Sequence, residues 1–138
     1  MTKPRTIKEL KIWQKSVDLA VASYGVSKGF PKEERFGLVS QIRRAATSVP
    51  ANIAEGFGRW NSREFSRFLS IASGSLRELE THFQIAARLG YISANRLAPL
   101  FEAIDEVARM IYVMLSRIRA KQGSTSSNAT ADLLIPGS

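Results

Sequence analysis

Residues 61–90 read NSREFSRFLSIASGSLRELETHFQIAARLG, and they carry the clearest helical pattern in the chain. Asn61 stands just before the pattern and Glu64 follows three residues later, a spacing typical of the capping box at a helix N-terminus. Apolar side chains then recur every three or four residues until Gly90, which places them on one face of a helix. The apolar positions are Phe65, Phe68, Leu69, Ala72, Leu76, Leu79, Phe83, Ala86 and Ala87. This segment predicts a long amphipathic helix that needs other helices to cover its apolar face.

The same period continues on both sides of this segment, and no stretch alternates apolar and polar residues as a strand does. Further helices are predicted at about 7–28, 32–57 and 93–121. Four helices with short connections predict an all-α, antiparallel up-down-up-down four-helix bundle. We expect one domain over residues 1–122, followed by a disordered tail at 123–138, where the period is lost.

Each flanking helix has a predicted buried face. In the first helix these positions are Leu10, Trp13, Val17, Ala20 and Tyr24, and in the second they are Leu38, Ile42, Ala45, Val49 and Ile53. In the fourth they are Leu97, Leu100, Phe101, Ile104, Val107, Ala108, Ile111, Leu115 and Ile118. Pro50 predicts a kink in the second helix, because it removes a backbone donor and clashes with the preceding turn. The glycines at 56 and 58 favour a left-handed terminus for this helix.

The amino-acid composition limits which catalytic and metal sites the protein can have. The 138 residues include no cysteine and a single histidine, which excludes disulfides, thiolate metal sites and thiol nucleophiles. Twenty Lys and Arg against twelve Asp and Glu give a net charge of +8, which indicates a polyanionic partner such as nucleic acid. The chain has neither a signal peptide pattern nor an apolar run of about 18 residues, so we expect a cytoplasmic protein without a membrane segment.

The second helix also has a polar stripe beside its apolar one. Gln41, Arg44, Ser48, Asn52, Glu55 and Arg59 recur at spacings of three and four. The stripe can be a solvated face, but Asn, Gln and Ser are poor helix-interior residues unless their side chains find partners. The alternative that we favour is a buried polar seam, with Gln41, Ser48, Asn52 and Glu55 at a contact between subunits.

Arginines gather around the turn between the second and third helices. The candidate nucleic-acid-binding residues are Arg43, Arg44, Arg59, Arg63, Arg67 and Trp60. The planar guanidinium group matches phosphate oxygens, and an exposed tryptophan can stack on a base. The alternative is that these charges serve only solubility. Trp13 and Tyr91 can also stack on bases, but Trp13 lies within the predicted core stripe.

The sequence gives little support for a catalytic site or a metal site. His82 follows Glu78 and Glu80, but a bundle metal site needs more histidines and carboxylates than this pattern offers. A small enzyme that uses Glu55 or His82 is one remaining alternative, although the sequence pairs neither with a second acid or base. We expect no cofactor, no metal and no enzymatic activity.

The second helix reads QIRRAATSVPANIAEGFGR over residues 41–59, and this run resembles the signature of the 23S rRNA intervening-sequence protein family. LKIWQK at 10–15, Phe30-Pro31, RFLSIASGSL at 67–76 and ELET at 78–81 fit the same family. The likeness extends over residues 8 to about 120.

This resemblance implies an antiparallel four-helix bundle that assembles as a homopentamer and has no enzymatic activity. Distant relatives are basic accessory subunits that bind the reverse transcriptase and the RNA of diversity-generating retroelements. We therefore expect a non-catalytic, homo-oligomeric bundle that binds RNA or DNA through an arginine-rich surface. The alternative is an accessory subunit whose main partner is a reverse transcriptase.

Overall fold

The structure, a computed structural model, describes residues 6–59 and 61–125. All regular elements within these residues are helices. In chain order they are η1 (Ile7–Glu9), α1 (Lys11–Ser27), η2 (Lys32–Glu34), α2 (Leu38–Phe57), α3 (Ser62–Arg88) and α4 (Ala94–Thr125), where η denotes a short 3-10 helix. The predicted all-α class is confirmed.

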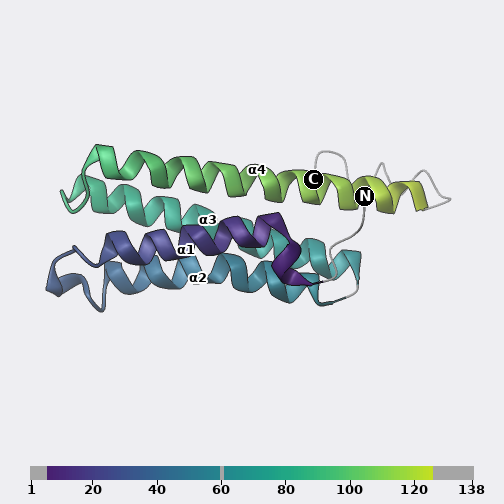
Figure 1. Cartoon of the computed structure of the whole chain (residues 1–138), viewed down its shortest axis with the longest axis horizontal. Helices are drawn as coiled ribbons and strands as arrows, with labels where there is room; N and C mark the ends of the chain where they lie inside the picture. The colour runs from purple at the N-terminus through teal and green to yellow at the C-terminus, as the bar shows by residue number, and fades with distance from the viewer. Residues whose placement is uncertain (1–5, 60, 126–138) are drawn as a thin grey trace.

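The four α-helices lie side by side and alternate in direction (Figure 1). From purple to yellow, α1 runs to the left of the view, α2 to the right, α3 to the left and α4 to the right. α1 packs against α2 and α4, and α3 packs against the same two helices. The bundle therefore encloses one core between four helices, as the short connections predicted.

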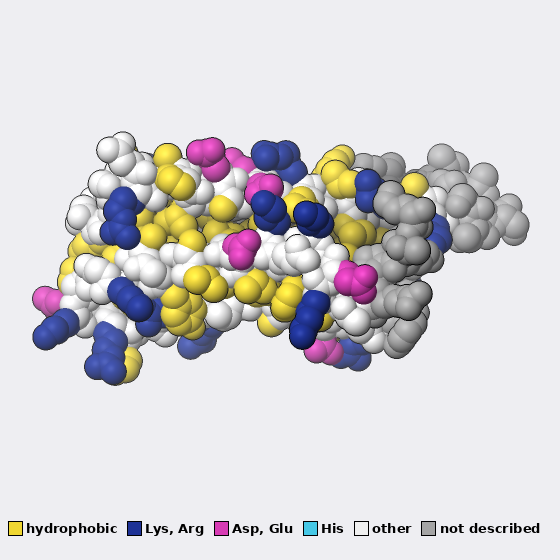
Figure 2. Space-filling view, viewed as in Figure 1, with side chains coloured by type: hydrophobic (Ala, Val, Ile, Leu, Met, Phe, Trp, Pro, Cys, Tyr) yellow, Lys and Arg dark blue, Asp and Glu magenta, His cyan; other side chains and the backbone are white. Residues whose placement is uncertain are grey.

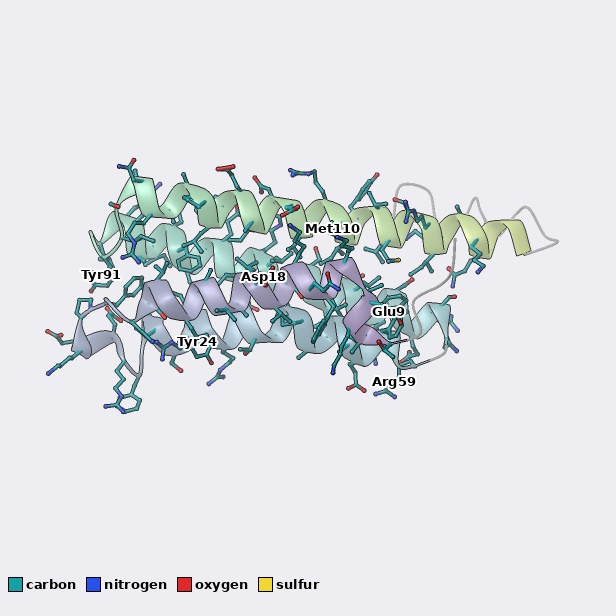
Figure 3. The ribbon with its side chains drawn as sticks, viewed as in Figure 1. Glu9, Asp18, Tyr24, Arg59, Tyr91 and Met110 are labelled. Atoms are coloured by element: carbon teal, nitrogen blue, oxygen red, sulfur yellow. The ribbon has the colours of Figure 1, made fainter. Side chains whose placement is uncertain are left out.

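The two ends of the bundle carry different connections. The α1–α2 loop and the α3–α4 turn meet at one end, which we call the Tyr91 end (Figure 3). The α2–α3 turn lies at the opposite end, which we call the Arg59 end. The last turns of α4 extend past the other helices at the Arg59 end (Figure 1).

The core is apolar and follows the predicted faces of α2, α3 and α4. Its side chains with no exposed surface include Ile42, Val49, Ile53, Leu69, Leu76, Leu79, Phe83 and Ile104. Removing each from water stabilises the fold by about 1.5–3 kcal/mol. These residues hold the helices in register, and they fix where the polar side chains on the outer faces can meet.

The predicted buried face of α1 is wrong in part. Leu10 and Ala20 are buried, but Trp13 and Val17 are only half-buried and Tyr24 is exposed. The buried face instead includes Ser16, Ser23 and Ser27, each of which donates a hydrogen bond to a backbone carbonyl one turn earlier. Serine is compatible with a core when its hydroxyl is satisfied in this way, so apolar periodicity misplaced the face.

α2 begins later than predicted, at Leu38. The segment before it forms η2 and an irregular turn, and the carboxylate of Glu34 accepts a 3.0 Å hydrogen bond from the backbone of Leu38. This bond satisfies one of the free donors of the first turn. Pro50 is buried within α2, and the helix continues past it to Phe57.

The glycines at the end of α2 do not adopt the predicted left-handed conformation. Gly58 is right-handed, with a φ of −78°, and Gly56 lies inside the helix. A Cβ atom on Gly56 would lie 2.7 Å from the Cβ atom of Phe68, so the glycine is needed for close approach between α2 and α3. The glycines do mark the end of α2, but Gly56 is required by helix packing and not by a left-handed backbone conformation.

Both ends of α3 lie where the sequence predicted them, but the capping box is incomplete, because the Glu64 carboxylate accepts from Arg67 and not from the Asn61 backbone. The side chain of Asn61 accepts hydrogen bonds from the backbones of Arg63 and Glu64, as an N-cap residue does. At the other end Gly90 has a φ of +82°, and Gly90 and Tyr91 donate to the carbonyls of Ala87 and Ala86. This is a Schellman motif, which favours glycine at its left-handed position.

α4 runs to Thr125, beyond the predicted end at 121, and it contains Pro99 near its start. From residue 126 on, the predicted tail lies outside the described residues. Among the helices of the described segments, none combines the length and the apolar character that crossing a membrane requires.

Candidate nucleic-acid interface

Three arginines meet at the Arg59 end of the bundle. Arg59 follows α2, whereas Arg63 and Arg67 lie one turn apart at the start of α3, and all three are exposed. The Asn61 cap starts α3 immediately after the turn and so sets these positions. The structure therefore brings together three of the arginines that the sequence singled out.

The ring of Phe68 forms the floor of this cluster. The guanidinium of Arg67 lies 4.5 Å from the ring centroid and that of Arg59 lies 5.3 Å from it. Cation–π contact of this kind favours a guanidinium that lies over the aromatic face. Arg59, which follows α2, and Arg67, on α3, are thus both held over one buried ring in defined positions.

Two glutamates share the cluster. Glu55 accepts a 2.6 Å hydrogen bond from Arg59, and Glu64 accepts bonds of 3.1 and 3.3 Å from Arg67. The hydrogen bond from Arg67 lowers the pKa of Glu64, and the charges of all three arginines lower it further. The same bond raises the pKa of Arg67. The lowered pKa favours the ionised form of Glu64, and the cluster combines three arginines with two glutamates.

Arg63 differs from its neighbours. Its guanidinium makes no hydrogen bond or ion pair with any residue that the structure describes. Because the pairs of Arg59 and Arg67 are exposed, water screens them and they contribute little to stability. A phosphate group can bind Arg63 directly and compete with the glutamates for the other two guanidinium groups.

Arg43 and Arg44 lie elsewhere on the bundle. Arg43 precedes Arg59 by 16 residues, a distance of roughly 24 Å along α2. Its Nε atom donates to the hydroxyl of Ser27 at 3.0 Å, and its guanidinium lies 4.6 Å from the ring centroid of Tyr24. Figure 3 shows Tyr24 on the side of the Tyr91 end and Arg59 at the other end.

These contacts tie Arg43 to α1, whereas Arg44 is exposed. The five predicted arginines therefore form two groups rather than one surface. The remaining candidate of the set, Trp60, lies outside the described residues.

The polar stripe on α2 is divided between the interior and the surface. The hydroxyls of Ser48 and Ser75 lie 2.8 Å apart, and the amide of Asn52 donates to Ser48. These three half-buried or buried side chains form a polar contact between α2 and α3 of one chain. Gln41 and Glu55 are exposed. The partners expected for Ser48 and Asn52 are thus found within the chain.

The two residues weighed for catalysis lie far apart. Glu55 lies next to Gly56, which contacts Phe68, whereas His82 lies fourteen residues beyond Phe68 on α3. This separation is roughly 21 Å along the helix. Over residues 6–59 and 61–125, no group of three His, Cys, Asp or Glu side chains is arranged to hold a metal ion.

The topology adds basic residues that the sequence analysis did not select. The antiparallel arrangement places the start of α1 and the last turns of α4 at the Arg59 end (Figure 1). The last turns of α4 contribute Arg117, Arg119 and Lys121, the start of α1 contributes Lys11, and η1 just before it contributes Lys8. The predicted antiparallel bundle already implies that the start of the first helix and the end of the fourth lie at the same end, so these residues could have been predicted from the sequence. Figure 2 shows that Lys and Arg side chains are spread over the visible face and do not form one dense patch.

Comparison with known proteins identifies a family. The family model described as 23S rRNA-intervening sequence protein matches residues 8–113. A search of curated protein sequences gives no match.

One similar solved structure is the 1.70 Å crystal structure of a protein of unknown function, from the S23 ribosomal protein family, from Bacteroides thetaiotaomicron. It is 23% identical, with a TM-score of 0.68, and the alignment covers 75% of this chain and 97% of the other. At this identity the likeness supports the fold alone.

Proposed function

Because the chain belongs to the 23S rRNA-intervening sequence protein family, we propose that it is a non-catalytic, homo-oligomeric bundle that binds RNA or DNA. Its ligand is the phosphate backbone, bound with little preference for sequence. The protein acts in the cytoplasm and needs no cofactor. A net charge of +8 supports attraction to a polyanion, and it makes a long-range contribution to the association rate.

The observation that carries this proposal is the cluster at the Arg59 end, in which Arg59 and Arg67 lie over Phe68 and Arg63 lies one turn before Arg67. Guanidinium groups held over a buried ring lose less conformational freedom on binding than free side chains do. Arg59 and Arg67 are paired with Glu55 and Glu64, and Arg63 has no such partner among the described residues. This combination suits phosphate oxygens, which accept paired hydrogen bonds from arginine.

The oligomer is part of the proposal. The expected assembly is a homopentamer, as the resemblance to the family implies. The polar stripe would lie at or near the contact between subunits. Its exposed residues, Gln41 and Glu55, would face the neighbouring subunit, and the half-buried Ser48 and Asn52 would lie next to them on α2. Repetition of the arginine cluster in each subunit would place several clusters on one particle, and multivalent binding increases the overall affinity.

The test is a salt titration. Affinity for a short RNA and for a duplex DNA is measured between about 50 and 300 mM salt, since counterion release gives a log–log slope of about −0.9 per contacted phosphate for duplex DNA. We expect affinity to fall steeply with salt and to vary little between sequences. Binding that ignores salt, or no binding to any RNA or DNA at low salt, would contradict the proposal and favour a protein partner.

A further inference from the structure

Phe36 is the most exposed large hydrophobic side chain among the described residues. It lies in the α1–α2 loop at the Tyr91 end, between η2 and α2, and 88% of its surface is exposed. The guanidinium of Arg35 lies 5.4 Å from the ring centroid and covers part of it. A single exposed apolar side chain is common on protein surfaces, so Phe36 indicates a binding surface only together with an uncovered apolar surface that fits it.

The loop holds this ring in place. Glu34 accepts hydrogen bonds from the hydroxyl of Tyr91 at 2.9 Å and from the backbone of Leu38 at 3.0 Å. The backbone of Gly37 donates to the carbonyl of Glu34. Residues on both sides of Phe36 are thus tied to α2 and to the α3–α4 turn. A side chain presented on such a loop gives up little conformational entropy when it binds.

The same end of the bundle has an open hollow on the outer surface of α3 and α4. Its volume is about 340 Å³. It is lined by Glu80, Thr81, Gln84, Ile85, Arg88 and Phe101. Ile85 is 45% exposed, and Leu89 beside it is 54% exposed. The hollow is therefore a second apolar surface that the described residues leave uncovered.

The hollow suits an aromatic side chain in size and in charge. A protein cavity of about 150 Å³ accommodates benzene, so 340 Å³ has room for a phenyl ring and part of its flanking chain. Two charged residues line it: Glu80, which is already paired with Arg77 at 2.8 Å, and Arg88, which has no ion-pair partner among the described residues. Glu33, an exposed carboxylate, lies three residues before Phe36. A contact can therefore pair Glu33 of one copy with Arg88 of the next.

We propose that Phe36 of one copy inserts into the α3–α4 hollow of a second copy and anchors the contact between subunits. This inference rests on the homo-oligomer of the proposed function and names the surfaces that form it. Because the ring and the hollow are different surfaces, the contact is heterologous, and each copy keeps one of each for further neighbours. Both lie at the Tyr91 end, so copies rotated about an axis parallel to the bundle can repeat the contact and close a ring.

The first experiment replaces the ring. Phe36→Ala removes no buried contact, so the fold should persist, as judged by circular dichroism. Light scattering and sedimentation then compare its mass with that of the wild type. We expect the concentration at which the assembly dissociates to rise by at least about tenfold, as for the central anchor of an interface. Tyr112→Ala is the matched control, because Tyr112 is an aromatic residue on α4 that is 68% exposed, and its mass should not change.

The second experiment mixes two defective chains. Gln84→Trp fills the hollow from an exposed position and leaves Phe36 intact, whereas Phe36→Ala leaves the hollow intact. At a concentration where the wild type assembles and Phe36→Ala does not, each variant alone should be monomeric. An equimolar mixture has one working ring and one working hollow per pair, so it should form dimers and nothing larger. A mixture that stays monomeric, or that assembles as far as the wild type, would overturn the proposal.

The outcome also separates this inference from the proposed function. If wild type assembles and Phe36→Ala leaves its mass unchanged, the contact is wrong and the oligomer stands. If Phe36→Ala instead weakens RNA binding without changing the mass, the ring stacks on bases and the contact is likewise wrong. A wild-type protein that is monomeric at micromolar concentration would overturn the oligomer itself, together with this contact.

Discussion

Gly56 and Phe68 approach so closely that a Cβ atom on the glycine would lie 2.7 Å from the Cβ atom of Phe68. This contact joins the end of α2 to the start of α3, directly beneath Arg59 and Arg67. Since Phe68 is the ring over which both guanidiniums lie, the glycine also determines how the arginine cluster is assembled.

Gly56→Ala should therefore destabilise the protein by about 1–3 kcal/mol, as is typical when a methyl group is forced into a packed contact. Denaturant unfolding measures the change. Gly74→Ala is the matched control, because a Cβ atom at Gly74 meets nothing within 4 Å. Alanine is the better helix former by about 0.5–1 kcal/mol, so this second variant should be more stable than the wild type. Equal effects of the two changes would contradict the close approach.

Truncation of the α3 core should be costly. Leu76 and Phe83 have no exposed surface, and either change to alanine leaves a cavity between helices. We expect each variant to lose about 2–5 kcal/mol of unfolding free energy. A loss below about 0.5 kcal/mol in denaturant melts of both variants would mean that the assigned face of α3 is wrong.

Alanine substitutions of Arg43 and Arg44 should differ in their effects on stability and on RNA binding. Arg43→Ala breaks the hydrogen bond to Ser27 and the contact with Tyr24, so it should lower stability by about 1 kcal/mol. Arg44→Ala removes only an exposed charge, and its stability should stay within about 0.5 kcal/mol of wild type. In RNA-binding assays Arg44→Ala should lose more affinity than Arg43→Ala. A larger stability loss for Arg44→Ala, or a larger affinity loss for Arg43→Ala, would disprove this assignment.

The double change Arg63→Ala with Arg67→Ala should flatten the salt dependence of nucleic-acid binding. Each lost phosphate contact reduces the slope by about 0.9 for duplex DNA, so we expect a change of about one to two units per chain. Both side chains are exposed, and helical content and oligomer mass should therefore remain as in wild type. An unchanged slope would place the phosphate contacts elsewhere, with the basic residues at the ends of α1 and α4 as the next candidates.

The Tyr91–Glu34 hydrogen bond predicts a dependence on alkaline pH. The bond to Glu34 raises the pKa of Tyr91 above its ordinary value of 10.0. A raised pKa means that the folded state favours the protonated hydroxyl, so its contribution is complete below about pH 10 and is lost as pH rises through the folded value. The melting temperature of Tyr91→Phe should therefore be lower than that of wild type at pH 7, and the difference should shrink above pH 10. A difference that stays constant up to pH 11 would show that the hydroxyl does not contribute through this bond.

Most of the fold could be predicted from sequence because helical periodicity is a local property. The apolar stripes of α2, α3 and α4 identified their buried faces, and Asn61 and Gly90 marked the ends of α3. α1 was the exception, since Ser16, Ser23 and Ser27 occupy its core face. Their hydroxyls bond to the backbone of their own helix, and a hydropathy pattern does not register that compensation.

The sequence by itself determined four amphipathic helices, their alternating order and a basic surface, because propensity, spacing and charge are written in neighbouring residues. Only the tertiary structure decided that Arg59 and Arg67 share one aromatic ring, that Arg43 is bound to α1, and that the described residues leave Phe36 and the α3–α4 hollow uncovered. Each of these depends on distances between residues on different helices. Those distances are set by how closely the helices pack, and at Gly56 by the absence of a single Cβ atom.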